Sequence, residues 1–321
     1  RTLHIDWYCI FFETNLMKMT IVHNYQIYLN FLNLTSFLCI TSIEFSIGDQ
    51  PLNKEFLVAI NSVREAGKIT LELLGNKSTS SKKSNGDTIS EADISVNKLL
   101  KKRLTSAFPN YGWLSEETVD DDERLNKELV WIIDPIDGTR EFVEGIPEYV
   151  ICIALVENGA PIVGVQYNPA LDQLFASIRN GGSFLNGKRI FCSESRDLSK
   201  ASVAVSRSEY KRGEIEPFRS YMGELTPIGS VAYKLALVAS GHYDINFSVQ
   251  PKNEWDICAG DLLIREAGGC LMDLNGCIRS YNQENTLIEK GLIAGNSHLV
   301  NSTLRVLNNK EHSFQNGDPT S

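Results

Sequence analysis

Residues that bind soft metals or build disulfide frameworks are few in this sequence. Its 321 residues include five histidines, none at metal-ligand spacing, and seven scattered cysteines without a CxxC pair. An odd, dispersed set of cysteines in a chain of this length is typical of reduced thiols, and it supports neither a zinc site nor a disulfide framework. The composition therefore predicts a cytoplasmic protein.

Basic residues are also fewer than acidic residues. Lys and Arg number 31 against 40 Asp and Glu, which gives a formal net charge of −9. This acid excess argues against a protein that binds nucleic acid polymers by neutralising their phosphates. A smaller phosphate-bearing molecule can still bind, provided that a metal ion or a local cluster of donors supplies the positive charge.

The first 47 residues contain no glycine, proline or alanine. Their apolar-rich run 27–40 faintly resembles a signal peptide, but asparagines interrupt it and no small-residue cleavage site follows. The run is also too short and too polar for a transmembrane helix, so no membrane association is expected. We therefore treat residues 1–48 as an N-terminal extension outside the expected fold.

After this extension the pattern predicts two helices and then a series of strands. Apolar residues at helical spacing predict one helix from Phe56 to Leu73 and another that begins at Ser90 as N-cap. Between them, the polar and lysine-bearing run 76–87 predicts an exposed, mobile loop. Short strands are then expected at 111–114, 129–133, 149–156, 162–167 and 174–178.

Beyond residue 190, strands and helices alternate. Strands are expected near 201–205, 243–247, 270 and 292, and helices at 208–222, 231–240 and 255–267. At about 150 residues per domain, the length suggests two domains. We predict an α+β half at 49–190, an α/β half at 191–308 and a disordered tail at 309–321.

The most informative segment is WIIDPIDGTREF, residues 131–142. An apolar strand ends at Asp134, and Asp137 follows just before Gly138 and Thr139. Two carboxylates at a strand end, together with the backbone N–H groups of the glycine and threonine, are suited to a divalent metal and a phosphate. A merely solvated acidic turn would leave the flanking apolar residues unexplained.

Other acids occur at comparable places. Glu116 and Glu117 follow the strand YGWLS, and Asp93 and Asp256 each open a predicted helix. Each acid taken alone is more typical of a helix start or a surface charge than of a metal ligand. Their combination favours a shared carboxylate site.

In these segments the sequence resembles the inositol monophosphatase superfamily of magnesium-dependent, lithium-sensitive phosphatases. DPIDGT at 134–139 and WDICAGDLLIREAGG at 255–269 are similar to its two signature motifs. SEE at 115–117 and TISEAD at 88–93 occur in the family's order. The resemblance spans about residues 52–305, and it implies an α/β (α+β) fold: a layered αβαβα sandwich of the sugar-phosphatase type.

The same resemblance implies roles for individual residues. The implied ligands of two or three Mg²⁺ ions are Glu116, Asp134, the carbonyl of Ile136, Asp137, Asp256 and, at a weaker additional site, Asp93. The implied catalytic residues are Thr139, Asp93 and Glu116, with the threonine helping to orient and deprotonate the attacking water. No cysteine or histidine nucleophile is expected, because metal ions can activate water directly.

The residues that bear on substrate choice are mixed. Arg140-Glu141-Phe142 and the run PKNEWD at 251–256 resemble the 3'(2'),5'-bisphosphate nucleotidases. Ser248 falls near the glutamate with which inositol monophosphatases hold the inositol ring, and a serine offers no carboxylate there. Against this, GSVAYKLALVASG at 229–241 has the spacing typical of the inositol monophosphatase branch.

The leading hypothesis is hydrolysis of adenosine 3',5'-bisphosphate to AMP and phosphate, with inositol 1-phosphate or another sugar phosphate as the alternative. A second phosphate needs a cation away from the metal ions, for which the candidates are Arg140, Lys234, Lys252 and Arg207. The predicted substrate-binding residues are Gly138, Thr139, Arg140 and Lys234.

The acidic residues by themselves are also compatible with two further classes of protein. A non-catalytic relative would bind metal or phosphate as a sensor, although degenerate relatives usually lose an acid or the threonine, and this chain retains them all. A hydrolase that uses two carboxylates without metal, as glycosidases do, would stay active in EDTA. A homodimer is possible, since members of the resembling family are often dimeric.

Overall fold

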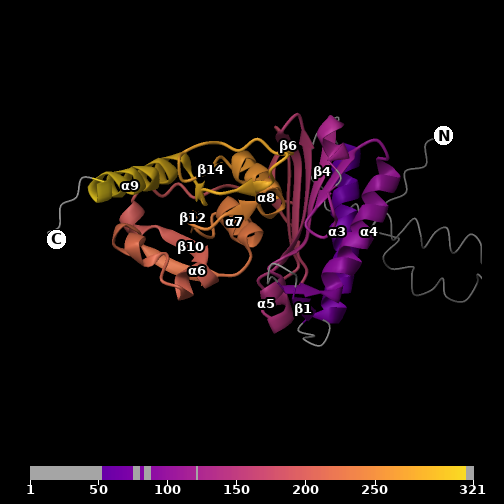
Figure 1. The fold of residues 1–321 in the computed structure, drawn as a ribbon, viewed down its shortest axis with the longest axis horizontal. Coiled ribbons are helices and arrows are strands. Elements are labelled where there is room, and N and C mark those ends of the chain that lie inside the picture. Colours follow the sequence, from indigo (N-terminus) through magenta and orange to yellow (C-terminus); the bar gives the residue numbers. More distant parts are fainter. Residues whose placement is uncertain (1–52, 75–79, 83–87, 121, 316–321) are drawn as a thin grey trace, which may run out of the picture. The chain divides into compact units, whose positions relative to one another are not determined.

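The computed structural model describes residues 53–74, 80–82, 88–120 and 122–315 (Figure 1). All of them belong to one compact unit, residues 47–321. Within these ranges, every helix is either too short or too polar to cross a lipid bilayer. The predicted extension 1–48 lies outside the described residues.

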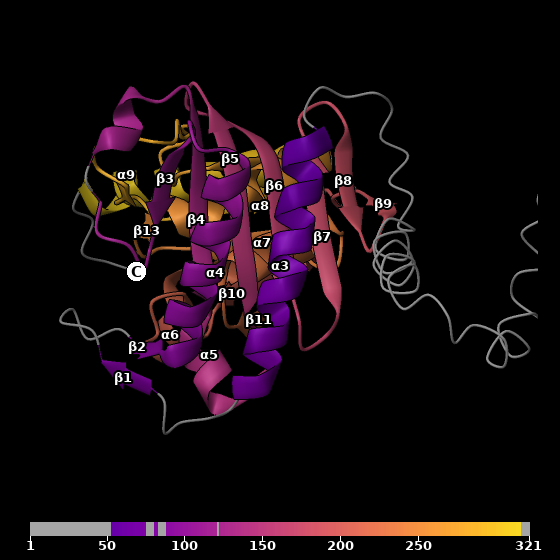
Figure 2. The same cartoon turned by 90° about the vertical axis from the view of Figure 1, so that its right-hand side faces the viewer.

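Two helices cover one face of a seven-stranded sheet (Figure 2). The helices, α3 (Asn53–Leu73) and α4 (Glu91–Ala107), pack against each other and against the sheet. Their apolar residues recur every three or four positions, as Val96, Leu100 and Leu104 do in α4, and these side chains are buried. Both helices agree with the sequence prediction.

The seven-stranded sheet has the order β3-β4-β5-β6-β7-β8-β9, in which β3 and β4 are parallel and the other neighbours antiparallel. Its strands are β3 (Gly112–Ser115), β4 (Leu129–Asp137), β5 (Val150–Glu157), β6 (Ala160–Asn168), β7 (Gln173–Ile178), β8 (Gly182–Leu185) and β9 (Lys188–Ile190). The first five were predicted. The last two are too short and too rich in Gly and Lys to show a strand period.

Two further helices, α7 (Val231–Ala239) and α8 (Glu254–Glu266), lie between this sheet and a second sheet. Most of their residues are buried, because sheets cover the helices on both sides. The second sheet has the order β11-β10-β12-β16-β14. Its strands are β10 (Ser202–Ser206), β11 (Glu224–Ile228), β12 (Ile245–Ser248), β14 (Cys270–Met272) and β16 (Leu292–Gly295).

The outer layer is formed by α9 (Ser297–Gln315), which packs on β14 and β16, with α6 (Arg207–Lys211) beside β10 and β11. The layers therefore alternate helix, sheet, helix, sheet, helix (Figure 1). This confirms the predicted layered αβαβα sandwich. The remaining elements are β13 (Lys252–Asn253), which pairs with β15 (Leu287–Ile288), and the 3-10 helices η3 (Glu123–Asn126), η4 (Leu198–Lys200) and η5 (Glu216–Tyr221).

Three local predictions differ from the structure. The helix expected at 208–222 is broken into α6 and η5, because Gly213 adopts φ +76° and Pro217 opens the second piece. Part of the loop expected at 76–87 is a strand, β1 (Ser80–Lys82), paired with β2 (Thr88–Ser90); the rest lies outside the described residues. The tail expected from 309 is helical as far as Gln315, because α9 continues to that residue.

Candidate metal and phosphate site

The end of β4 brings two carboxylates to one side of the sheet. Side chains alternate along a regular strand, so Asp134 and Asp137 would point to opposite faces. The pairing with β5 is irregular here, with Asp134 opposite Cys152 and Asp137 opposite Val150, so β4 has one extra residue. This bulge turns both aspartates to the same side.

Asp256 joins these two residues from α8. It is the third residue of the helix, and its Oδ2 accepts a hydrogen bond of 2.8 Å from the N–H of Asn253 at the N-cap. Carboxylate oxygens of Asp134, Asp137 and Asp256 all lie within 4.8 Å of one another. The structure thus brings together three of the five acids predicted as ligands.

Asp137 is oriented by the start of α7. Its Oδ2 accepts hydrogen bonds from Ser230 Oγ at 2.6 Å and from the N–H of Ala232. The next residue, Gly138, has φ +97°, and a Cβ there would lie 2.7 Å from the carbonyl oxygen of Glu148. Only glycine fits this turn, which directs Thr139 toward the cluster.

Asp93 lies at the start of α4 in the same way as Asp256 lies in α8. Its Oδ2 accepts from the N–H and the hydroxyl of Ser90, at 2.8 and 2.6 Å, which confirms the predicted N-cap. Its Oδ1 lies 3.0 Å from Thr139 Oγ1, which is also 3.0 Å from the carbonyl oxygen of Ile136. The predicted catalytic threonine therefore contacts two of the predicted ligands.

Glu116 follows β3, and its N–H donates to the carbonyl of Ile133 at 3.3 Å. Its side chain lines the same cavity as the aspartate cluster. It is not one of the three acids whose oxygens lie within 4.8 Å of one another.

Burial and mutual repulsion raise the pKa values of these acids. Burial, followed by the charges of Glu116, Asp137, Asp256 and Asp93, raises the pKa of Asp134 well above its usual value. Burial likewise raises the pKa of Asp256 well above that of a free aspartate. For Asp93, burial outweighs its hydrogen bonds to Ser90 and Thr139, and the pKa is about 6.

The cluster fits a divalent cation. Asp134 Oδ1 accepts the N–H of Ile136 at 3.0 Å, but its Oδ2 is buried without a hydrogen-bond partner among the residues that the structure describes. A buried carboxylate oxygen without a donor is costly. Oxygens gathered in this way are the ligands that Mg²⁺ prefers, and such an ion would relieve both the repulsion and the missing bond.

The cluster opens into a cavity of about 440 Å³ between β4, α5 (Thr139–Glu144), α6, α7 and α8. A second cavity, lined by Ile257 and by residues between 271 and 292, is slightly larger at about 470 Å³. None of the clustered carboxylates lines it. Six basic side chains line the same cavity as the acid cluster: Arg140, Arg207, Lys211, Arg212, Lys234 and Lys252.

The predicted phosphate-binding cations differ in burial and in their hydrogen-bond and ion-pair partners. Lys234 is buried, and its Nζ lies within 3.4 Å of the carbonyl oxygens of Ile228, Gly229 and Ser230. Burial lowers its pKa to about 8. The three carbonyl acceptors hold the Lys234 ammonium at the turn before α7, and its contact with substrate stays a prediction.

Arg207 and Arg140 line the cavity as well. Arg207 pairs with Glu141 at 3.1 Å and with Glu148 at 2.5 Å. Arg140 is exposed at the mouth, and so is Lys211 on α6. Neither of these two cations forms an ion pair within the described ranges.

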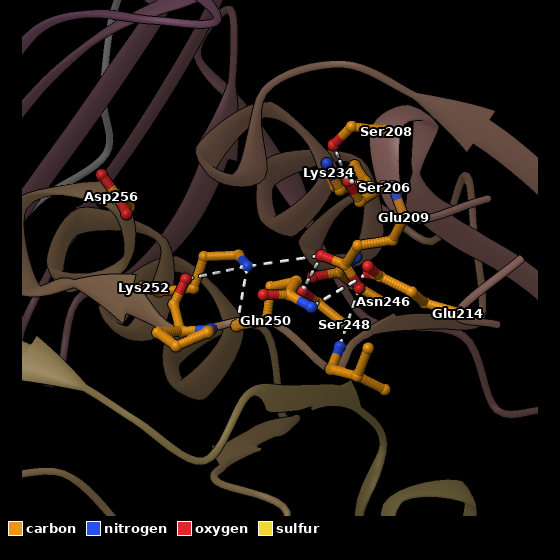
Figure 3. Close-up of polar contacts among 12 residues, drawn as sticks. Ser206, Ser208, Glu209, Glu214, Lys234, Asn246, Ser248, Gln250, Lys252 and Asp256 are labelled. Carbon is orange, nitrogen blue, oxygen red and sulfur yellow. Dashed lines mark hydrogen bonds and ion pairs between the residues drawn. The ribbon is translucent and has the colours of Figure 1, made fainter. Parts of the chain in front are cut away.

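A further buried acid, Glu209 of α6, was not predicted (Figure 3). It accepts from Ser248 Oγ at 2.6 Å and from the N–H of Val249 at 2.8 Å, and Lys252 Nζ lies 3.4 Å away. Ser248 is where the sequence lacked a carboxylate, so the structure brings one there from another element. No local pattern could have indicated this, because Glu209 and Ser248 are 39 residues apart.

A layered fold that gathers buried carboxylates at a strand end and a helix start, in a cavity rimmed by cations, defines a hydrolase of phosphoric monoesters. Comparison with known proteins agrees. A sequence model of the inositol monophosphatase family matches residues 52–312. The chain belongs to the inositol monophosphatase family.

Named relatives support this assignment. Inositol monophosphatase 2 of Solanum lycopersicum is 33% identical over 270 residues, which cover 80% of this chain and all of the relative. Histidinol-phosphatase of Chlorobaculum parvum is 30% identical over 266 residues, covering 81% and 99%. The structure of an IMPase from Thermotoga maritima aligns with a TM-score of 0.71 at 28% identity, covering 79% of this chain and 97% of that one.

Proposed function

We propose that this phosphatase depends on Mg²⁺, held in two or three sites by the acids predicted from the sequence. The observation that carries this proposal is the trio Asp134, Asp137 and Asp256, together with the buried Asp134 Oδ2 that lacks a donor. The proposed ligands are Glu116, Asp134, the carbonyl of Ile136, Asp137 and Asp256, with Asp93 at the weaker site. Inhibition by Li⁺ is expected from the family resemblance.

Bound metal would neutralise the substrate phosphate and increase the acidity of a nearby water. The chain's own residues then move the proton. Thr139 Oγ1 lies 3.0 Å from Asp93 Oδ1, so the hydroxyl can accept a proton from the water while passing its own to Asp93. The water oxygen bonds to phosphorus as the bond to the alcohol oxygen breaks.

For the substrate, we propose adenosine 3',5'-bisphosphate, which yields AMP and phosphate. The cations Arg140, Arg207, Lys211 and Arg212 line the same cavity as the acid cluster. Arg207 and Arg212 pair with glutamates, and Arg140 and Lys211 are exposed. Once metal ions balance the acids, this rim attracts a second phosphate on the leaving group. The Arg140-Glu141-Phe142 run supports the same choice.

Inositol 1-phosphate is the second candidate. The buried carboxylate of Glu209 lines the cavity beside Ser248, and a carboxylate can accept hydrogen bonds from ring hydroxyls. The relative from Solanum lycopersicum carries the name of an inositol monophosphatase. The homodimer and the cytoplasmic location stay predictions.

Phosphate release from the two esters, measured side by side with Mg²⁺ and with EDTA, tests these proposals. We expect faster release from the bisphosphate, and no turnover in EDTA. Lys211→Ala should raise KM for the bisphosphate about fivefold, equivalent to about 1 kcal/mol, and leave KM for inositol 1-phosphate unchanged. Arg219→Ala, outside the cavity, is the matched control.

Either of two results would count against the proposals. Faster release from inositol 1-phosphate contradicts the nucleotide assignment alone. Full activity in EDTA contradicts the metal assignment and favours a hydrolase that uses carboxylates only.

A further inference from the structure

A buried arginine outside the site links two distant parts of the chain. Arg124 in η3 is 1% exposed. Its Nε and Nη2 donate to Asp120 Oδ2 at 2.8 and 2.6 Å. Its Nη1 donates to Asn282 Oδ1 at 2.7 Å, and Nη2 also reaches the carbonyl of Gln283 at 3.0 Å. One guanidinium therefore joins segments that are about 160 residues apart.

On one side, these bonds lead to the helix that carries Asp256. The N–H groups of Asn282 and Gln283 donate to the two carboxylate oxygens of Glu254, at 2.6 and 3.2 Å. Glu254 is fully buried and is the first residue of α8, two positions before Asp256. The loop that Arg124 holds thus holds the start of α8.

On the other side, the guanidinium holds Asp120, which follows the turn that carries Glu116 along the chain. Asp120 lies four residues after Glu116, and this turn is closed by a hydrogen bond of 3.2 Å from the N–H of Thr118 to the carbonyl of Ser115. Asn97 donates to Thr118 Oγ1 and accepts from Ser115 Oγ, at 3.0 and 2.8 Å. Asn97 lies one helical turn after Asp93 on α4.

We propose that Arg124 is a positioning residue that sets the spacing of Glu116 relative to Asp256, and through it the affinity for Mg²⁺. This inference rests on the metal site proposed above. The planar guanidinium fixes three acceptors in one geometry, and the single ammonium of a lysine cannot do so. Groups that orient metal ligands typically affect metal affinity by at least about tenfold when they are replaced.

Isothermal titration of the substrate-free protein with Mg²⁺ tests the proposal without relying on activity. Arg124→Lys should weaken Mg²⁺ binding about tenfold, while kcat at saturating Mg²⁺ stays close to that of the wild type. The control is Arg265→Lys. Arg265 forms the same kind of two-nitrogen ion pair with Asp261, four residues away, but at the other end of α8.

Asn282→Gly is a milder second variant for the case in which Arg124→Lys does not fold. Asn282 has φ +60°, which glycine adopts readily. The change removes only the side-chain amide, whose oxygen accepts from Arg124 Nη1 and whose nitrogen donates to the backbone carbonyl of Arg124. We expect it to weaken Mg²⁺ binding as well. Unchanged affinity in both variants, or an equal loss in Arg265→Lys, would overturn the proposal. If the wild type itself binds no Mg²⁺, the proposed function has failed instead.

Discussion

Asp134, a proposed metal ligand, has a burial cost that a bound cation would offset. Its side chain is buried, one oxygen accepts a backbone N–H, and the other has no hydrogen-bond partner within the described part of the chain. Burial and the neighbouring acids raise its pKa well above the usual value. Without a cation, this carboxylate therefore destabilises the folded state.

The variant Asp134→Asn should separate the effect of Asp134 on stability from its effect on turnover. The amide keeps an oxygen for the N–H of Ile136 and removes a buried charge, so thermal stability in EDTA should stay equal or rise. Turnover in Mg²⁺ should fall by at least about 100-fold, because a proposed metal ligand is lost. Asp197→Asn, at an exposed residue, is the control. Unchanged turnover in Asp134→Asn would refute the metal assignment.

At the scale of elements, the site depends on the ends of helices and strands. α4 and α8 each present an aspartate as their third residue, and both aspartates accept the N–H of the N-cap residue. β4 supplies two more aspartates because its bulge reverses the side-chain alternation. The turn at Gly138 then connects β4 to α5.

Gly138→Ala tests how much this turn matters. A Cβ at φ +97° would lie 2.7 Å from the Glu148 carbonyl and 3.1 Å from Ser230 Cβ. Gly268 has φ +86°, and a Cβ there would meet nothing within 4 Å, so Gly268→Ala has the backbone strain alone. We expect a loss of about 1 kcal/mol for Gly268→Ala in urea unfolding. Gly138→Ala should lose more, and it alone should lose activity.

Equal destabilisation of the two variants, with activity retained in both, would show that the close contact at Gly138 has no importance for the site.

At the scale of the whole molecule, the two sheets and the helices between them bring charges together. Asp137 from the first sheet bonds Ser230 at the start of α7, and Arg207 of α6 pairs with Glu141 of α5. The assembled site holds several acids whose pKa values burial raises. The stability of the protein should therefore depend on pH and on metal together.

The sign of this dependence follows from linkage. An aspartate in the unfolded chain has a pKa of about 4, and that of Asp93 is about 6 in the folded, metal-free protein. The folded state thus binds more protons above about pH 4, and this contribution to stability falls as pH rises. Mg²⁺ needs the deprotonated ligands, so its stabilising effect should grow over the same range.

Melting temperatures in EDTA and in Mg²⁺, at about pH 5 and about pH 7, check this expectation. Both values lie below the pKa of about 8 for Lys234, so that group keeps its charge. The rise in Tm caused by Mg²⁺ should be larger at pH 7. Equal rises at both pH values would contradict the linkage argument.

The sequence patterns by themselves indicated most helices and strands and the acids of the site, and the layered fold was implied by the motif resemblance. The helix periods of α3 and α4, the cap at Ser90 and the DPIDGT turn are local patterns, and local hydrogen bonds determine them. The motif resemblance extended this to the family. The local patterns could not indicate β8 and β9, which are short and lack a strand period, or the break after α6.

Only the tertiary structure decided which side chains share the cavity. Lys234 proved to be occupied by three carbonyls, Glu209 supplied a carboxylate beside Ser248, and Arg124 joined two loops that the sequence separates by about 160 residues. The physical reason is that burial and pairing of these charges depend on contacts between elements far apart in the chain. Local patterns therefore identified the acids, and long-range packing determined their partners.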